Sequence, residues 1–527
     1  MASETSHPGV SAKAQIARAA GLVMALFVVS RALGLAREMV ISGQFGTSGN
    51  LDAYLAAFRL PDLIFQIIAG GALGSAFIPT FASYLGRDDQ QGAWRLASAV
   101  INLVLLLTAA LSVLAAIAAP WLVAGLIAPG FNPEQQALTV RLMRIMLVTP
   151  AIFGVSGVVM GILNARQHFL LPAVAPILYN LGIIAGAIFL APAMGVYGLA
   201  LGVAVGAAGH LLVQVPGLIR HKLRYAPILG MHDPGVHEVG RLMVPRMVGL
   251  AAVQLNFLVN TTLASGLAAG SLAALNYAWL LMLLPQGVFA QAVATAAFPT
   301  FSLQVAQGQR DEMRASLAAT LRAVLYLTVP AAAGLLVLRV PLTQLLFERG
   351  AFAADSTRLV AWALACYALG LPAHSLVEIV VRAFYALHDT KTPVGVGVAA
   401  MGLNVTLSLA SIPIFKAAGW PAHAGLALSN SLATTVEMAV LLWLIRRRLG
   451  GMEGRRLFRA AVRIVVCAAY MGATIGGLAW LLAGRSFPAW LVAGLPVAVG
   501  AVVYAGASLL LGGSELDSLW GMVRPRR

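Results

Sequence analysis

The chain has 527 residues, 60% hydrophobic and only 10% charged, and its 35 Lys and Arg against 19 Asp and Glu give a net charge of +16. Soluble globular proteins are about 25% charged, so this composition excludes a set of soluble domains and indicates many bilayer crossings of about 20 apolar residues each. Basic residues collect in the cytoplasmic loops of membrane proteins and set their orientation in the bilayer. We therefore attribute the positive charge to such loops and expect no nucleic-acid partner.

In chain order, the apolar runs predict an all-α polytopic membrane protein with about fourteen transmembrane helices. The first run, 16–41, contains charged residues that a cleavable signal peptide lacks, so we expect it to be retained as a helix. The later helices are expected at 52–84, 93–119, 136–164, 170–191, 196–220, 238–262, 271–305, 315–338, 357–387, 393–414, 423–446, 457–483 and 488–512. Most Lys and Arg residues fall in the loops of one side, which predicts that both termini are cytoplasmic.

Short motifs recur about 220 residues apart along the chain. Pro79-Thr80-Phe81 recurs as Pro299-Thr300-Phe301, and the stretch 164–172 is paralleled by 385–393. The offset spans an even number of predicted helices, so the two halves have the same orientation, as in a parallel repeat that alternates access to a midplane cavity. The sequence therefore predicts two six-helix lobes, 1–225 and 226–450, and a C-terminal helix pair within 451–527.

The first two predicted helices carry an unusual concentration of charge, formed by Arg31, Arg37, Glu38, Asp52, Arg59 and Asp62. Charged groups inside a bilayer cost several kcal/mol each and usually face a cavity or a partner. Because a guanidinium group matches the geometry of phosphate oxygens, the arginines are predicted to bind an anionic head group. The alternative is structural, with Arg37 paired to Glu38 or Asp52, and Arg59 paired to Asp62.

Arg31 and Arg37 lie about 120° apart on an ideal helix. A bend at Gly34, which stands between them, would bring both arginines toward one cavity. Arg246, near the start of the seventh predicted helix, is a further candidate for the head-group site or for an interfacial position.

Other polar residues inside predicted helices give weaker indications. Asn260, Asn404 and Ser408 are weak candidate cation ligands, and hydrogen bonding between helices is the commoner role for such residues. Glu378 and Arg382 are expected to form a local i,i+4 salt bridge.

No enzyme motif and no metal-spaced set of Cys and His residues occurs in the sequence. The chain is therefore predicted not to be an enzyme and to hold no metal or cofactor. Without a nucleotide site, transport is expected to draw on a Na⁺ or H⁺ gradient, the membrane potential or the substrate gradient.

Several motifs extend over nearly the whole chain: Ser30-Arg31-x-Leu33-Gly34-x-x-Arg37-Glu38, Arg59-Leu60-Pro61-Asp62-Leu63, Ala128-Pro129-Gly130-Phe131 and Arg382-Ala-Phe-Tyr385-Ala-Leu-x-Asp389-Thr-Lys-Thr-Pro393. Together they resemble the MurJ (MviN) lipid II flippase family of the MOP exporter superfamily. The resemblance implies a MATE-like fold in the bacterial inner membrane, with a C-terminal helix pair that forms a groove for a polyprenyl tail. It also implies transport of a polyprenyl-diphosphate lipid between leaflets by alternating access, and cell-wall synthesis proteins as candidate partners.

The resemblance assigns functional roles to the charged residues of the first two helices. Arg31, Arg37 and Glu38 match the family's first-helix Arg, Arg and acid, whereas Asp52 and Arg59 match its second-helix acid and base.

The chain departs from the family pattern at two places. Phe65 and Gln66 stand in the helix-two stretch where many members carry a further arginine, and 277–283 reads Tyr-Ala-Trp-Leu-Leu-Met-Leu where members often read Tyr-Ala-Asp-Arg-Leu-Met-Glu. Leu280 thus replaces an arginine, for which Arg246 could compensate. These departures keep two alternatives open: an exporter of another polyprenyl-linked saccharide or amphiphile, and a non-transporting envelope scaffold.

Overall fold

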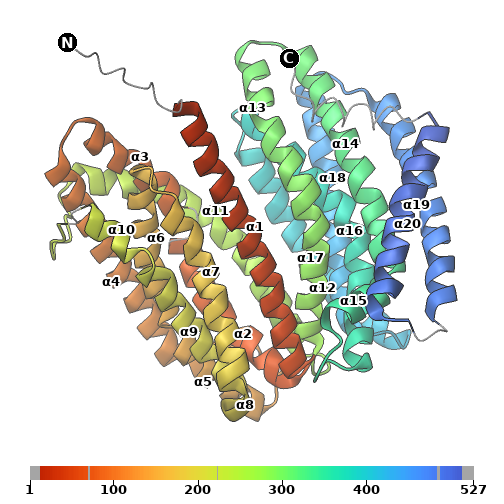
Figure 1. The fold of residues 1–527 in the computed structure, drawn as a ribbon, viewed down its shortest axis with the longest axis horizontal. Helices are drawn as coiled ribbons and strands as arrows, with labels where there is room; N and C mark the ends of the chain where they lie inside the picture. Colours follow the sequence, from red (N-terminus) through yellow and green to blue (C-terminus); the bar gives the residue numbers. More distant parts are fainter. Residues whose placement is uncertain (1–11, 69–71, 222–223, 484–486, 513–527) are drawn as a thin grey trace, which may run out of the picture. The chain divides into compact units, whose positions relative to one another are not determined.

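A computed structural model describes residues 12–68, 72–221, 224–483 and 487–512, and Figure 1 shows its helices in chain order. Within these ranges the regular elements are all helices. Eleven helical stretches of the described residues are long and apolar enough to cross a membrane. The all-α membrane fold predicted from composition is confirmed, and the total of about fourteen crossings stays a prediction.

The helices form two compact units. The first unit contains the chain up to Phe45 together with Gly49–Thr262, and the second contains Gly46–Ser48 together with the chain from Leu263. The predicted lobe boundaries at 225 and 450 are not tested by this division and stay predictions.

The first unit is built mainly from paired long helices, of which α7 packs against both α1 and α9, and α6 packs against α3 and α4. Its elements are α1 (Ala12–Phe45), α2 (Gly49–Ile68), α3 (Ala72–Gly86), α4 (Gln90–Leu122), η1 (Val123–Ile127), α5 (Pro133–Met146), α6 (Thr149–Ala165), α7 (Leu170–Ala185), η2 (Gly186–Leu190), α8 (Ala191–Met194), α9 (Val196–Leu212), α10 (Val215–Arg220) and most of α11 (Pro234–Ser265).

In the second unit, α16 packs against α12, α14 and α18, and α18 also packs against α17. The elements are α12 (Ser271–Pro285), η3 (Gln286–Gln291), α13 (Ala292–Ala306), α14 (Arg310–Val337), α15 (Arg339–Phe347), α16 (Ala354–Ala386), α17 (Lys391–Ala417), α18 (Ala422–Arg448), α19 (Gly454–Ala483) and α20 (Ala489–Leu510). The C-terminal pair α19 and α20 packs on α14, where the Tyr504 hydroxyl donates to the Tyr326 carbonyl at 2.9 Å.

Three expectations for helices were wrong, and the first concerns 196–220, which is divided into α9 and α10. The single helix expected at 136–164 is divided into α5 and α6, because Pro150 has no amide hydrogen and its ring disfavours a continuous helix through the preceding turn. Pro150 instead occupies the first turn of α6, where a missing amide hydrogen is tolerated. The short helix α15 was not expected at all.

The internal repeat extends to the backbone of the turns. Gln167 and His388, which are 221 residues apart, both have a φ of 58°. The amide of the next residue, His168 or Asp389, donates to the carbonyl five residues earlier, at 2.8 Å and 3.0 Å respectively. The left-handed residue followed by this hydrogen bond is a helix C-cap, so both halves end a helix in the same way before α7 and α17.

Candidate functional site

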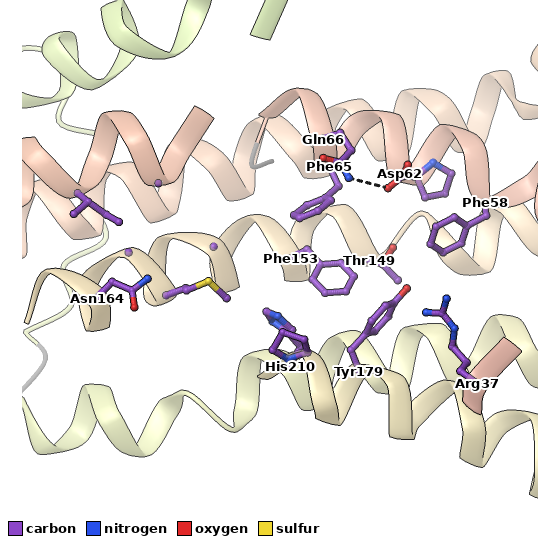
Figure 2. Close-up of a pocket in the computed structure, with 17 residues that line it drawn as sticks. Arg37, Phe58, Asp62, Phe65, Gln66, Thr149, Phe153, Asn164, Tyr179 and His210 are labelled. Atoms are coloured by element: carbon purple, nitrogen blue, oxygen red, sulfur yellow. Dashed lines mark hydrogen bonds between the residues drawn. The ribbon is translucent and has the colours of Figure 1, made fainter. Parts of the chain in front are cut away.

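The first unit contains a cavity of about 550 Å³, lined by side chains of α1, α2, α3, α6, α7 and α9 (Figure 2). Its polar lining comes from Arg37, Asp62, Gln66, Thr149, Asn164, Tyr179 and His210. Arg37 lies at one end of the view and Asn164 at the other, with aromatic rings between them. A cavity with a few polar groups on apolar walls has the usual form of a small-molecule site.

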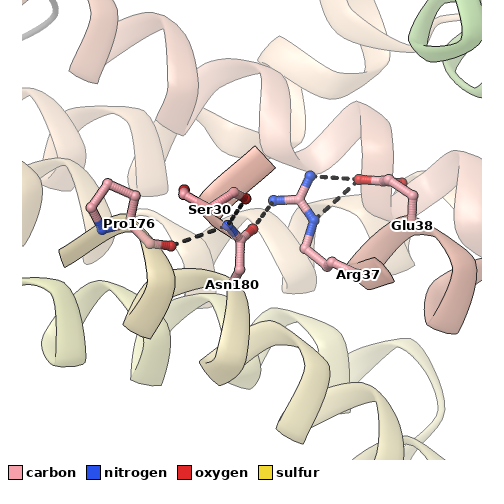
Figure 3. Close-up of polar contacts among 5 residues, drawn as sticks. All are labelled: Ser30, Arg37, Glu38, Pro176 and Asn180. Carbon is pink, nitrogen blue, oxygen red and sulfur yellow. Dashed lines mark hydrogen bonds and ion pairs between the residues drawn. The ribbon is translucent and has the colours of Figure 1, made fainter. Parts of the chain in front are cut away.

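The Arg37 side chain is fixed by partners on two helices (Figure 3). Its Nε and Nη2 donate to Glu38 Oε1 at 3.2 Å and 2.6 Å, and its Nη1 donates to Asn180 Oδ1 at 3.1 Å. The Asn180 amide in turn donates to the Pro176 carbonyl at 3.1 Å and to the Ser30 carbonyl at 3.5 Å. These contacts hold the guanidinium in one orientation at the cavity wall.

The same contacts leave Arg37 able to bind an anion. The side chain is 26% exposed, against 12% for Glu38. A guanidinium group has five N–H donors, and the hydrogen bonds to Glu38 and Asn180 use three of them. The predicted ion pair with Glu38 is therefore present, and two donors remain for a ligand.

Asp62 and Arg59 connect α2 to α11. The Asp62 carboxylate accepts from Gln254 at 3.0 Å and from Gln66 at 3.5 Å. Arg59 Nε donates to Thr261 Oγ1 at 2.8 Å, and the guanidinium carbon lies 5.7 Å from the centroid of the Phe257 ring. Asp62 lines the cavity, and Arg59 is not among its lining residues.

The structure places two other predicted binding residues, Arg31 and Asp52, outside the lining of the cavity. Arg31 is exposed, with its guanidinium carbon 5.2 Å from the Phe27 ring, and α1 runs as one helix past Gly34. Asp52 is buried in the first turn of α2. The side chain of Arg246 lies outside the part of the chain that the structure describes.

The weak cation candidates are divided between the two units. Asn260 is half-buried in the first unit, whereas Asn404 and Ser408 are buried one turn apart on α17 of the second. The Ser408 hydroxyl donates to Asn404 Oδ1 at 3.4 Å. Among the described residues there is no group of three or more His, Cys, Asp or Glu side chains that could hold a metal ion.

Sequence reasoning missed the cavity residues contributed by α6, α7 and α9. The clearest available signal was His210, an imidazole within an otherwise apolar helix. Its Nδ1 lies 2.7 Å from Ser156 Oγ, which also accepts from Gln214 Nε2 at 2.7 Å. The Ser156 hydroxyl also lies 3.4 Å from the His210 carbonyl, so these contacts engage Nδ1 in either tautomer and leave Nε2 outside the cluster.

Next to Leu280, which stands in place of an arginine, the Trp279 side chain of α12 packs against other rings in the second unit. The Trp279 ring lies 5.2 Å from Tyr367 and 5.5 Å from His374, and His374 Nε2 is 3.1 Å from Asn430 Oδ1. On the same helix as His374, the expected Glu378–Arg382 salt bridge is present at 2.6 Å. Of the charged positions in the family pattern of α12, the acid before the arginine is thus an aromatic ring here, and the arginine is Leu280.

Comparisons with known proteins bear on this site. A family model described as "Lipid II flippase MurJ" matches residues 41–499. The lipid II flippase MurJ of Burkholderia cenocepacia is 34% identical over 441 residues, 82% of this chain and 84% of the relative. A probable lipid II flippase MurJ of Rhizobium tropici is 31% identical over 509 residues, 94% of this chain and 93% of the relative.

Solved structures give the same fold. A lipid II flippase MurJ in an inward closed conformation matches with a TM-score of 0.77 and 26% identity, over 93% of this chain and 98% of that one. An inward-facing multidrug resistance MATE transporter of the MOP superfamily matches with a TM-score of 0.67 over 81% of this chain and 98% of that one. At 16% identity the second likeness concerns the fold alone, and it confirms the predicted MATE-like architecture.

Proposed function

The chain belongs to the MurJ family, and from this membership and the geometry around Arg37 we propose that it moves lipid II from the inner to the outer leaflet of the cytoplasmic membrane by alternating access. Lipid II is the undecaprenyl-diphosphate-linked precursor of peptidoglycan. The observation that carries the proposal is a partly exposed guanidinium with two available donors in a cavity among apolar helices. Phosphate charges in such surroundings require a cationic partner.

Glu38 gives the proposed site a means of reversible binding. The Glu38 carboxylate neutralises Arg37 across 2.6 Å. An arriving diphosphate binds the two N–H donors that Glu38 and Asn180 do not use, and when it leaves, Glu38 still supplies a counter-charge to Arg37. Asn180 keeps the guanidinium in place as the diphosphate binds and leaves, because it bonds the nitrogen that Glu38 does not contact.

The remaining predicted residues are proposed as secondary contacts to the head group. Arg31 lies on the same helix as Arg37 and is exposed. It can therefore contact the lipid phosphate before the phosphate enters the cavity. Arg59, Asp52 and Arg246 are retained as candidate binding residues on the strength of the family resemblance. Both termini are proposed to be cytoplasmic, and cell-wall synthesis proteins remain candidate partners.

Energy coupling is also a proposal, with a Na⁺ gradient, an H⁺ gradient and the membrane potential as the sources. Dissipating each one separately in proteoliposomes that carry labelled lipid II identifies the source. A dependence on Na⁺ that Asn404→Ala or Ser408→Ala abolishes would support the weak cation candidates on α17. Loss of transport only on collapse of the potential would exclude them.

The test of the proposed function is growth of a bacterial strain depleted of its own lipid II flippase. We expect the wild-type chain to restore growth and Arg37→Ala to fail at a matched level of membrane protein. The matched control is Arg358→Ala, which removes an arginine of the second unit whose ion pair with Asp355 is exposed. Growth of Arg37→Ala equal to wild type would overturn the role of Arg37.

A second candidate function is export of another polyprenyl-linked saccharide. It is favoured by Leu280, which stands where the family pattern has an arginine, and by the ring packing of the neighbouring Trp279. Failure of the wild-type chain to restore growth, with transport of a different polyprenyl-diphosphate sugar in proteoliposomes, would select this alternative. Absence of transport of any labelled lipid, with stable complexes in pull-downs, would select the envelope scaffold.

A further inference from the structure

Four rings from four helices meet inside the cavity of the first unit. Phe153 on α6 is at the centre, and its ring centroid lies 5.2 Å from Phe65, 5.0 Å from Tyr179 and 5.3 Å from His210. All four residues line the cavity, and Figure 2 shows them between Arg37 and Asn164. We call Phe65, Phe153, Tyr179 and His210 the aromatic wall.

The aromatic wall borders open space and is not closed core. Phe65, Phe153 and Tyr179 are half-buried, in contrast to Phe77 and Phe81, which are fully buried in the same unit. The cavity volume of about 550 Å³ falls within the range of roughly 300–1,000 Å³ that holds small ligands. The rings therefore present faces and edges to whatever occupies the cavity.

The polar groups around the aromatic wall suit a ligand with many hydroxyls. Asp62 and Gln66 offer oxygens on one side, and Asn164 offers both an amide donor and an acceptor at the far end. His210 adds its Nε2 as a further hydrogen-bonding atom, because its Nδ1 is engaged by Ser156. A carboxylate and several neutral donors and acceptors beside ring faces are a combination that matches a pyranose, whose hydroxyls lie at its edge and whose C–H bonds form an apolar face.

We propose that the aromatic wall is a sugar-binding subsite, on which a pyranose ring of the head group stacks while Arg37 holds the diphosphate. The inference rests on the proposed function and deepens it. The order of groups in the cavity matches the order of groups in the ligand, because the sugar is bonded directly to the diphosphate and the rings come next after Arg37. The subsite binds the saccharide, and Arg37 binds the negatively charged diphosphate.

The experiment measures binding of three lipids to the purified full-length protein. The probes are undecaprenyl diphosphate without sugar, the same lipid with one amino sugar, and the same lipid with a disaccharide. Phe153→Leu keeps apolar volume but removes the central ring of the aromatic wall. Phe298→Leu, on α13 outside the cavity, is the matched control.

We expect Phe153→Leu to weaken binding of both sugar-bearing lipids about 5-fold and to leave undecaprenyl diphosphate unchanged, since aromatic stacking contributes on the order of 1 kcal/mol. Arg37→Ala should weaken all three lipids together. Equal weakening of all three by Phe153→Leu, or none, overturns the subsite.

Two further measurements separate the possible failures. If the wild-type protein binds none of the three lipids, the proposed function fails before the subsite is tested. If Phe153→Leu lowers the thermal unfolding midpoint below that of Phe298→Leu, then Phe65→Leu probes the same wall from α2. An unchanged sugar preference in that variant also overturns the proposal.

Discussion

The turn before α7 and the turn before α17 share a backbone and differ in chemistry. In the first, the rings of His168 and His221 meet edge to face at 5.9 Å. In the second, Asp389 forms an ion pair with Arg448 at 2.6 Å and accepts from the Thr392 hydroxyl and amide at 2.6 Å and 3.0 Å. The repeat therefore preserves the path of the backbone at these turns, whereas the side chains that stabilise this path have diverged.

The helix pairs that follow these turns differ in the same way. In the first unit α7 and α9 approach through glycines, and a Cβ added at Gly182 would overlap the backbone of Gly206. In the second unit Ser429 of α18 donates to Ser411 of α17 at 3.0 Å, and Gly425 of α18 packs on the side chain of Ser411, not on backbone. Close glycine contacts bring Tyr179 of α7 against α9, which carries His210, and thereby shape the cavity that only the first unit is proposed to use.

The largest effect is expected where α7 and α9 touch. A Cβ at Gly206 would lie 2.6 Å from the Tyr179 carbonyl oxygen, so Gly206→Ala must separate the helices. We expect a loss of about 2–3 kcal/mol in the free energy of unfolding, which is typical of overpacking. Equilibrium unfolding of the wild type and Gly206→Ala in mixed micelles measures this loss.

Gly402→Ala on α17 is the matched control for that substitution. A Cβ there meets nothing within 4 Å, so the free energy of unfolding should stay equal or rise slightly because alanine favours the helix. Equal losses at Gly206 and Gly402 would show that the glycine contact does not distinguish the two pairs.

A smaller effect is expected at the hydroxyl contact between α17 and α18. Ser429→Ala removes the hydrogen bond to Ser411, and bonds of this kind between membrane helices contribute about 0.6 kcal/mol. The same mixed-micelle unfolding experiment should therefore rank Ser429→Ala well below Gly206→Ala. A loss as large as that of Gly206→Ala would remove the contrast between the two helix pairs.

At the turn before α17 we expect a stability loss in acid. The Thr392 hydrogen bonds, together with the Arg448 guanidinium, hold the pKa of Asp389 below its ordinary value of 3.8. The folded state thus binds fewer protons, so this contribution is present above pH 3.8 and disappears as the pH falls through the lower folded value. The thermal unfolding midpoint of the wild type should fall as the pH decreases below 3.8. In Asp389→Asn the midpoint should depend less on pH over the same range. If the midpoint of Asp389→Asn depends on pH as strongly as that of the wild type, the Asp389 contacts are not the cause of the stability loss in acid.

At the turn before α7 the smallest effect is expected, in a different window. Burial lowers the pKa of His221 from its ordinary value of 6.5, and the charges of Arg166 and His168 lower it further. The unfolded state therefore takes up protons first, so stability falls as the pH drops below 6.5. Comparing midpoints at pH 7.5 and 5.5 in wild type and His221→Asn measures the difference. An equal fall of the unfolding midpoint in His221→Asn would exclude His221 as its cause.

Part of the candidate site was predictable from local sequence. Arg37 and Glu38 are adjacent, and two charges in an apolar run mark a cavity or a pair without any knowledge of the fold. Asn180, which holds the guanidinium, lies 143 residues from Arg37, and its helix has no pattern that points to that arginine. The aromatic wall was unpredictable for the same reason, because phenylalanine in an apolar helix is equally suited to core, lipid or cavity.

The sequence by itself determined that the chain is a bundle of membrane helices with an internal repeat. Apolar segments of this length must satisfy their backbone hydrogen bonds internally in a bilayer, so composition decides the helix before any packing occurs. Tertiary structure alone decided the rotation of each helix about its axis, which follows from side-chain packing between neighbours. That rotation places Arg37 at the cavity and leaves Arg31 exposed on the same helix.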